Sequence, residues 1–205
     1  MNVVMRQTLS YVLVALFCTG LWGCAGSQLT SNVASVLPVS EQWRSLTIDN
    51  FSVDVPPGFV AGLPGLELEA LQGSLEEMGF GDLADWLAQN AENIDVLAFQ
   101  QVGEQLNSIN VVRDGRSPEE TVEDYVMWKV QQLKTVGVKA ESEILETEPV
   151  VGKLQLLELG QAQSIYVFAG TDDFWVVTYS GKDGQFDDSL IEKSRRSVEI
   201  LSESE

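Results

Sequence analysis

Histidine is absent from the sequence, and its only two cysteines are Cys18 and Cys24. Without histidine, neither a Ser-His-Asp nor a Cys-His arrangement can form, and the usual zinc and non-haem iron ligand sets are excluded. The sequence also lacks the Gly-x-Ser-x-Gly nucleophile motif and the two glycine-rich phosphate-binding motifs. We therefore expect a protein that is not an enzyme and that needs no cofactor or metal.

Positive charge is scarce as well, because 12 lysines and arginines stand against 31 acidic residues, for a formal net charge of -19. Such a surface repels nucleic acid and anionic lipid headgroups, so we expect neither as a partner. The acidic groups at residues 170–173, 181–188 and 67–77 have neither EF-hand spacing nor a marked carboxylate pair for glycoside hydrolysis. Turns, helix caps and a solvated helix face account for them.

Residues 1–23 have the layout of an export signal, with Arg6 before an apolar run at residues 11–23. That run, of about 13 residues, is shorter than the roughly 20 that a membrane-spanning helix needs. The segment Leu21-Trp22-Gly23-Cys24 resembles the lipobox of bacterial lipoproteins. The alternatives are an uncleaved anchor and an ordinary secretory cleavage elsewhere.

The lipobox resemblance implies cleavage before Cys24, a diacylglycerol on its sulfur and an acyl chain such as palmitate on its amine. The protein would then be exported and anchored to the cell membrane or outer membrane, with its domain on the extracytoplasmic side. Ala25 after the cysteine favours the outer membrane in the same resemblance. We expect three parts: a signal peptide (1–23), a lipidated cysteine with a flexible tether (24–42), and one domain (43–205). The Ser-rich tether would span roughly 20–25 Å.

The first half of the domain alternates between strand and helix patterns. Apolar residues alternate on both sides of an Asp49-Asn50 turn, which indicates a hairpin that ends at Pro56-Pro57-Gly58. Apolar residues at helical spacing follow and indicate a first helix. A break at Gly79-Phe80-Gly81 separates it from a second helix that Asp82 would cap. The expected elements are strands within 46–55, helices at 66–78 and 82–90, and strands at 94–99 and 108–113.

The second half contains one long helix and a run of strands. Ser117-Pro118-Glu119-Glu120 is typical of a capping box with proline at the first helical position. An apolar stripe that includes Lys129 follows, and Gly137 is placed to end the helix in the left-handed conformation. Four strands and a closing helix complete the pattern, at residues 138–147, 153–160, 164–169, 174–180 and 186–201.

This order predicts an α+β fold, an αβα sandwich with a largely antiparallel central sheet and helices on both faces. Phe51 to Gly58 resembles the opening hairpin of the PsbP-like superfamily, and the capped helix and final hairpin are similar to its later elements. That superfamily includes extrinsic photosystem II subunits and bacterial lipoproteins of the DcrB and LpqN kind. The resemblance implies a non-enzymatic binding or assembly module, and the long helical segment at 62–90 favours its lipoprotein branch.

The aromatic residues are the candidates for a binding patch. Phe174 and Trp175 are neighbours on one strand, so they point to opposite sides of the sheet. They therefore belong either to two core layers or to an exposed patch with Phe80 and Trp86.

We expect a membrane-anchored, non-catalytic module that binds or helps to assemble a protein partner in the envelope or lumen. The alternative is a carrier of a small apolar or lipid ligand in a sheet–helix pocket beside Phe80 and Trp86.

Overall fold

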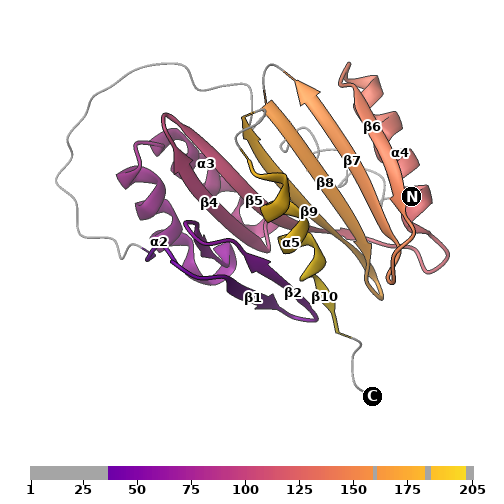
Figure 1. The fold of residues 1–205 in the computed structure, drawn as a ribbon, viewed down its shortest axis with the longest axis horizontal. Coiled ribbons are helices and arrows are strands. Elements are labelled where there is room, and N and C mark those ends of the chain that lie inside the picture. The colour runs from indigo at the N-terminus through magenta and orange to yellow at the C-terminus, as the bar shows by residue number, and fades with distance from the viewer. Residues whose placement is uncertain (1–36, 159–160, 183–185, 202–205) are drawn as a thin grey trace. The chain divides into compact units, whose positions relative to one another are not determined.

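The computed structural model describes residues 37–158, 161–182 and 186–201. A seven-stranded antiparallel sheet dominates this region, with the spatial order β3-β4-β5-β9-β8-β7-β6 (Figure 1). Its two end strands are therefore β3 and β6, and β5 and β9 lie near its centre. The strands are β3 (Val60–Gly62), β4 (Val96–Val102), β5 (Gln105–Gly115), β6 (Ala140–Leu145), β7 (Val151–Glu158), β8 (Gln161–Ala169) and β9 (Asp173–Lys182).

A second, three-stranded sheet contains the predicted hairpin. Strands β1 (Arg44–Ile48) and β2 (Phe51–Val55) pair antiparallel around a tight turn in which Asp49 has a φ of 49°. Strand β2 buries alternate residues, as its period-two pattern predicts. The short strand β10 (Glu199–Ile200) adds to the other edge of β2.

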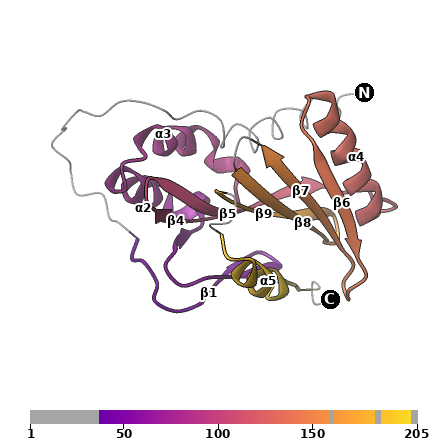
Figure 2. The same cartoon turned by 45° about the horizontal axis from the view of Figure 1, so that its top comes forward.

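Helices cover both faces of the large sheet, which confirms the α+β sandwich. Helices α2 (Pro64–Glu77), α3 (Gly81–Asn90) and α4 (Val122–Thr135) pack on one face. Helix α5 (Asp188–Arg196) and the small sheet pack on the other (Figure 2). A short 3₁₀ turn, η1 (Ala91–Asn93), leads from α3 into the sheet.

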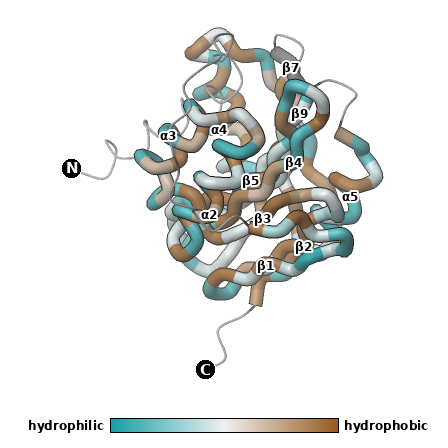
Figure 3. The backbone as a smooth tube through the Cα atoms, turned by 90° about the vertical axis from the view of Figure 1, so that its left-hand side faces the viewer, coloured by the Kyte–Doolittle hydropathy of each residue, from teal (hydrophilic) through white to brown (hydrophobic). Residues whose placement is uncertain are grey.

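Alternation along the central strands sends successive side chains into different core layers. On β9, Trp175 and Val177 belong to the core under α5 and the small sheet, while Phe174 and Val176 belong to the core under α4. A third apolar cluster lies under α2 and α3 and includes Phe99 of β4. Figure 3 shows these elements from the α2 side, with hydrophobic residues along β1, β2 and β3. The sheet is thus buried on both faces along most of its width.

Three predicted boundaries are wrong in detail. The long helix begins after Thr121 rather than after Ser117, because residues 117–120 close a separate turn in which the Glu120 N–H donates to the Ser117 carbonyl at 2.9 Å. The last helix ends at Arg196 instead of continuing to 201, since the chain extends to pair with β2. Helix α3 begins at Gly81 after Phe80, with no side-chain cap from Asp82.

The chain contacts the domain from Leu37 onward, before the predicted start of order at Trp43. The Leu37 N–H donates to Ser74 Oγ at 3.2 Å, and the Gly58 N–H donates to the Ser40 carbonyl at 2.8 Å. These bonds fix the chain beside β3 and α2. Cys24, the predicted lipidation site, lies outside the described residues, as do the predicted signal and most of the tether. Within the described ranges, no helix has the length and apolar character required to cross a membrane.

Candidate functional site

Helix α4 is a well-defined helix at the β6 end of the sheet, where it packs on β6, β7 and β8. Thr121 and Asp124 form its capping box, since each backbone N–H donates to the other residue's side-chain oxygen at 3.1 Å. Hydrogen bonds from Thr121 lower the pKa of the Asp124 carboxyl. At the other end, Gly137 has a φ of 84° and the Val138 N–H donates to the Leu133 carbonyl at 3.0 Å. The prediction of a left-handed glycine there is confirmed.

A buried polar cluster joins α4 to β5 at the centre of the sheet. The Lys129 ammonium nitrogen lies 3.4 Å from Asp114 Oδ2, with the two side chains 11% and 10% exposed. The Tyr125 hydroxyl donates to the same oxygen. The Lys129 nitrogen also lies 5.2 Å from the ring centres of Tyr125 and Trp128. The Lys129 nitrogen therefore lies close to two aromatic rings and one carboxylate.

Burial dominates the ionisation of this cluster. It raises the pKa of the Asp114 carboxyl, although the Tyr125 hydrogen bond acts in the opposite direction. It lowers the pKa of Lys129 well below its ordinary value. It also raises the pKa of Tyr125, and the Asp114 charge adds to that effect. All three groups are packed between helix and sheet, so we interpret the cluster as a polar link that positions α4.

Sequence reasoning placed Lys129 in the apolar stripe of α4 but did not identify this cluster. The available signal was a lysine four residues after a tyrosine on the buried side of an amphipathic helix. Its partner Asp114 lies near the end of β5, the strand that precedes α4 in the chain, and the sequence gives no pattern that pairs the two side chains. Only the three-dimensional fold brings the two charges together.

Arg116 fixes the loop before α4 to the hairpin between β8 and β9. Its side chain donates to the carbonyl of Gly170 at 2.6 Å and to that of Glu120 at 2.9 Å, and its N–H donates to the Asp172 carbonyl at 2.9 Å. Its guanidinium carbon also lies 5.5 Å from the centre of the Phe174 ring. Together with the buried cluster, these bonds hold α4 firmly against the sheet.

Close packing of α4 on β7 depends on Gly152. A Cβ atom at this position would lie 2.4 Å from Val126 Cγ2 and 2.9 Å from Val122 Cγ1. We predict that Gly152→Ala lowers the free energy of unfolding by about 1–3 kcal/mol, since overpacking forces neighbouring side chains to move. Urea denaturation followed by circular dichroism would measure it.

Gly115→Ala is the matched control, because a Cβ atom there would meet no atom within 4 Å. Combining Gly152→Ala with Val126→Ala should restore part of the loss if the clash is its cause. An equal effect of the Gly115 and Gly152 variants would show that the position of α4 does not depend on this contact.

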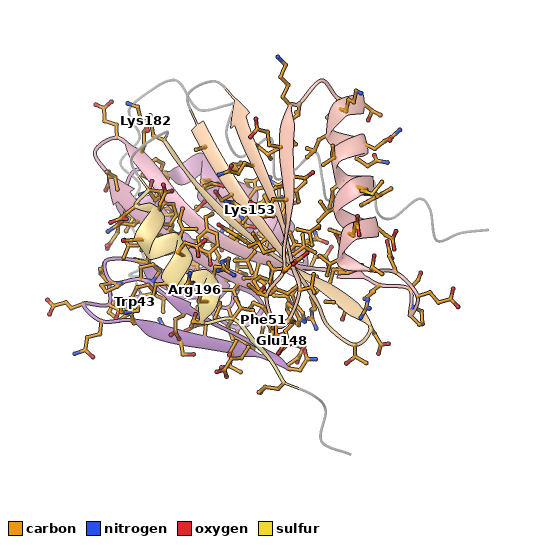
Figure 4. The ribbon with its side chains drawn as sticks, turned by 45° about the vertical axis from the view of Figure 1, so that its right-hand side comes forward. Trp43, Phe51, Glu148, Lys153, Lys182 and Arg196 are labelled. Carbon is orange, nitrogen blue, oxygen red and sulfur yellow. The ribbon has the colours of Figure 1, made fainter. Side chains whose placement is uncertain are left out.

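Among the strands that the structure describes, β6 is the outermost at this end, and its pairing partner is β7. Its residues Glu141, Ser142 and Glu143 are exposed. Glu143 lies opposite Lys153 of β7, so both belong to the same face of the sheet. Figure 4 shows the sheet with α4 on one side and α5 on the other, with Lys153 and Glu148 labelled. We define the α4–β6 end as helix α4, strand β6, the segment between them and the loop to β7.

The α4–β6 end also exposes apolar side chains. Six large hydrophobic residues are exposed in the described ranges, and three of them lie at the α4–β6 end. These are Met127 at 64%, Val136 at 63% and Val150 at 48%. Singly exposed apolar residues are normal on a protein surface. Their location beside an open strand edge makes this end a candidate contact surface.

The predicted aromatic patch is not formed, because Phe174 and Trp175 are 0% and 1% exposed. Phe174 packs against the Tyr125 ring under α4, with ring centres 4.5 Å apart. Trp175 stacks on Phe51 on the opposite face, also at 4.5 Å. The exposed-patch interpretation was therefore wrong for these two residues, and the two-layer core is correct. The physical reason is that helices on one face and the small sheet on the other bury both sides of β9.

Phe80 and Trp86 lie elsewhere, half-buried against the cluster under α2 and α3. A groove of about 690 Å³ opens near the start of α2, but neither residue lines it. Its lining is Leu37, residues 64–70, Ala91 and Glu92, which brings together three glutamates and the exposed Leu66. This groove is therefore at a different place from the pocket beside Phe80 and Trp86 that the carrier hypothesis expects.

No protein-family model and no curated protein matches this chain. Its structure is similar to that of cyanobacterial PsbP (CyanoP) from Synechocystis sp. PCC 6803, with a TM-score of 0.51 and 14% sequence identity. The similarity covers 87% of this chain and 100% of the cyanobacterial chain. The fold is thus PsbP-like, as the element order predicted.

Proposed function

We propose that this protein is a lipid-anchored, non-catalytic PsbP-like module that binds a protein partner through its α4–β6 end. The anchor rests on the lipobox-like segment before Cys24. The non-catalytic role rests on the missing histidine and on the packing of the titratable cluster as a link between α4 and β5. It is also consistent with the likeness to CyanoP, which supports the fold alone.

The single observation that carries the choice of surface is where the chain joins the domain. Leu37 lies beside β3, since its Cδ1 would be 2.9 Å from a Cβ atom on Gly62. Strand β3 is one end of the seven-stranded sheet and β6 is the other. Six strand spacings of about 4.8 Å separate the two ends by roughly 29 Å. A tether that joins at β3 enters the domain at the opposite end of the sheet from β6, so we assign partner contact to the α4–β6 end.

Site-specific photocrosslinking in the native membrane tests this proposal. A photoreactive residue at Glu141 of β6 should give a discrete crosslinked protein band, and one at Glu76 of α2 should not. Both positions are exposed glutamates, so the pair is matched in accessibility. The Cys24→Ser variant should lose incorporated fatty-acid label and the crosslink together, because both depend on the anchor.

Equal crosslinking from both positions, or none from Glu141, would contradict the assignment of the surface. Retention of fatty-acid label in Cys24→Ser would contradict the anchor. Recovery of lipid without any protein from the purified membrane form would favour the carrier function instead.

A further inference from the structure

Among the described residues, no strand pairs with the outer edge of β6 (Ala140–Leu145). In an antiparallel sheet an end strand bonds its neighbour through alternate backbone groups, and the remaining N–H and C=O groups point outward. The exposure of residues 141–143 shows that the middle of this strand faces solvent. An extended peptide can add to such an edge through main-chain hydrogen bonds.

The side chains of β6 specify which peptide fits. Glu141 and Glu143 are two residues apart, so they lie on one face of the sheet. A second copy of β6 would place glutamates beside glutamates, which disfavours self-pairing. An incoming strand with lysine or arginine at alternate positions would instead face both carboxylates.

The opposite face of β6 has a different character. Ala140 and Ile144 are half-buried and pack against the apolar cluster under α4, and the exposed Ser142 lies between them on this face. A strand added beside them would place its intermediate side chains next to this apolar layer. Apolar residues at those positions would extend the layer, whereas charged residues there would lose water without gaining a partner.

We infer that β6 accepts an extended protein segment in which basic and apolar residues alternate, as an added eighth strand of the sheet. This inference rests on the proposed function, because it names the partner chemistry at the same α4–β6 end. The seven-stranded sheet supplies the backbone template, and the two glutamates select the charge of the partner.

The test measures binding of a synthetic Lys-Val-Lys-Val-Lys-Val-Lys peptide to the full-length protein in detergent micelles. Hydrogen exchange should slow at the alternate amides within residues 140–145 that point away from β7 when the peptide binds, as expected for new main-chain hydrogen bonds. Glu141→Lys with Glu143→Lys should weaken binding about tenfold or more at low salt. Glu76→Lys with Glu77→Lys is the matched control, since it makes the same charge change on exposed residues of α2.

A peptide with the same residues but N-methylated at alternate backbone positions separates strand addition from simple charge attraction. It keeps every charge but loses donors and adds bulk along one edge, so it should bind at least tenfold more weakly. Equal binding of both peptides, or equal loss in both double variants, would overturn the inference. If the peptide fails while Glu141 still crosslinks a protein in the membrane, the strand chemistry is wrong and the proposed function stands.

Discussion

Trp175→Ala should reduce the free energy of unfolding by about 3–5 kcal/mol, as expected when a buried aromatic side chain is truncated. Trp175 is 1% exposed and stacks on Phe51, and the Arg113 guanidinium carbon lies 5.0 Å from its ring centre. Its removal would leave a cavity between the large sheet and the small one. Urea denaturation followed by circular dichroism would measure the loss.

Trp86→Ala is the comparison, because Trp86 is only half-buried against the α2–α3 cluster. Trp86→Ala should lower the free energy of unfolding clearly less than Trp175→Ala does, since a half-buried ring gains less from burial. A loss below about 1 kcal/mol for Trp175→Ala would be typical of a surface side chain. That result would contradict the two-layer core and revive the exposed-patch interpretation.

Asp114→Ala should also lower the free energy of unfolding by about 3–5 kcal/mol, because it breaks a buried charge pair by removing one partner. The variant would leave the Tyr125 hydroxyl without its carboxylate acceptor and Lys129 without the oxygen at 3.4 Å. Near-ultraviolet circular dichroism should change as well, since Tyr125 and Trp128 flank the lysine. Chemical denaturation would give the stability difference.

Asp114→Asn separates the loss of the acceptor from the loss of the charge. The amide oxygen can still accept from Tyr125, so this variant should be more stable than Asp114→Ala. Burial raises the folded-state pKa of Asp114 above its ordinary value of 3.8. A raised carboxyl pKa contributes stability at low pH, and the contribution is lost as the pH rises through that pKa.

The wild type should therefore lose stability relative to Asp114→Asn as the pH rises above the ordinary carboxyl pKa of 3.8. An opposite slope would mean that attraction to Lys129 outweighs burial. A loss of less than about 1 kcal/mol in the free energy of unfolding for Asp114→Ala would contradict the interpretation that the buried cluster positions α4.

Local chemistry predicted those parts of the fold that depend on neighbours in sequence. The hairpin at Asp49-Asn50 and the left-handed Gly137 follow from turn and cap preferences, and both are confirmed. The start of α4 was misplaced because two consecutive segments, at Ser117 and at Thr121, both offer capping chemistry. Contacts of Arg116 with a distant hairpin hold the first of them as a turn.

The parts that depend on distant partners could not be predicted in the same way. Strands β3 and β10 have three and two residues, so they exist only by pairing with β4 and β2. The open edge at β6 likewise requires the order of strands in the sheet, and the link from Lys129 to Asp114 requires the packing of α4 on β5. For the same reason the sequence placed the candidate patch at aromatic residues, whereas the fold has an open edge, among the described strands, at Glu141 and Glu143 of β6. The predicted patch residues were Phe80, Trp86, Phe174 and Trp175.

Mass spectrometry of the N-terminal peptide from the membrane-bound protein tests the lipid anchor. We expect this peptide to begin at Cys24 and to carry a diacylglycerol thioether, with the preceding 23 residues removed. A mature chain that begins elsewhere, or an unmodified sulfur at Cys24, would contradict it.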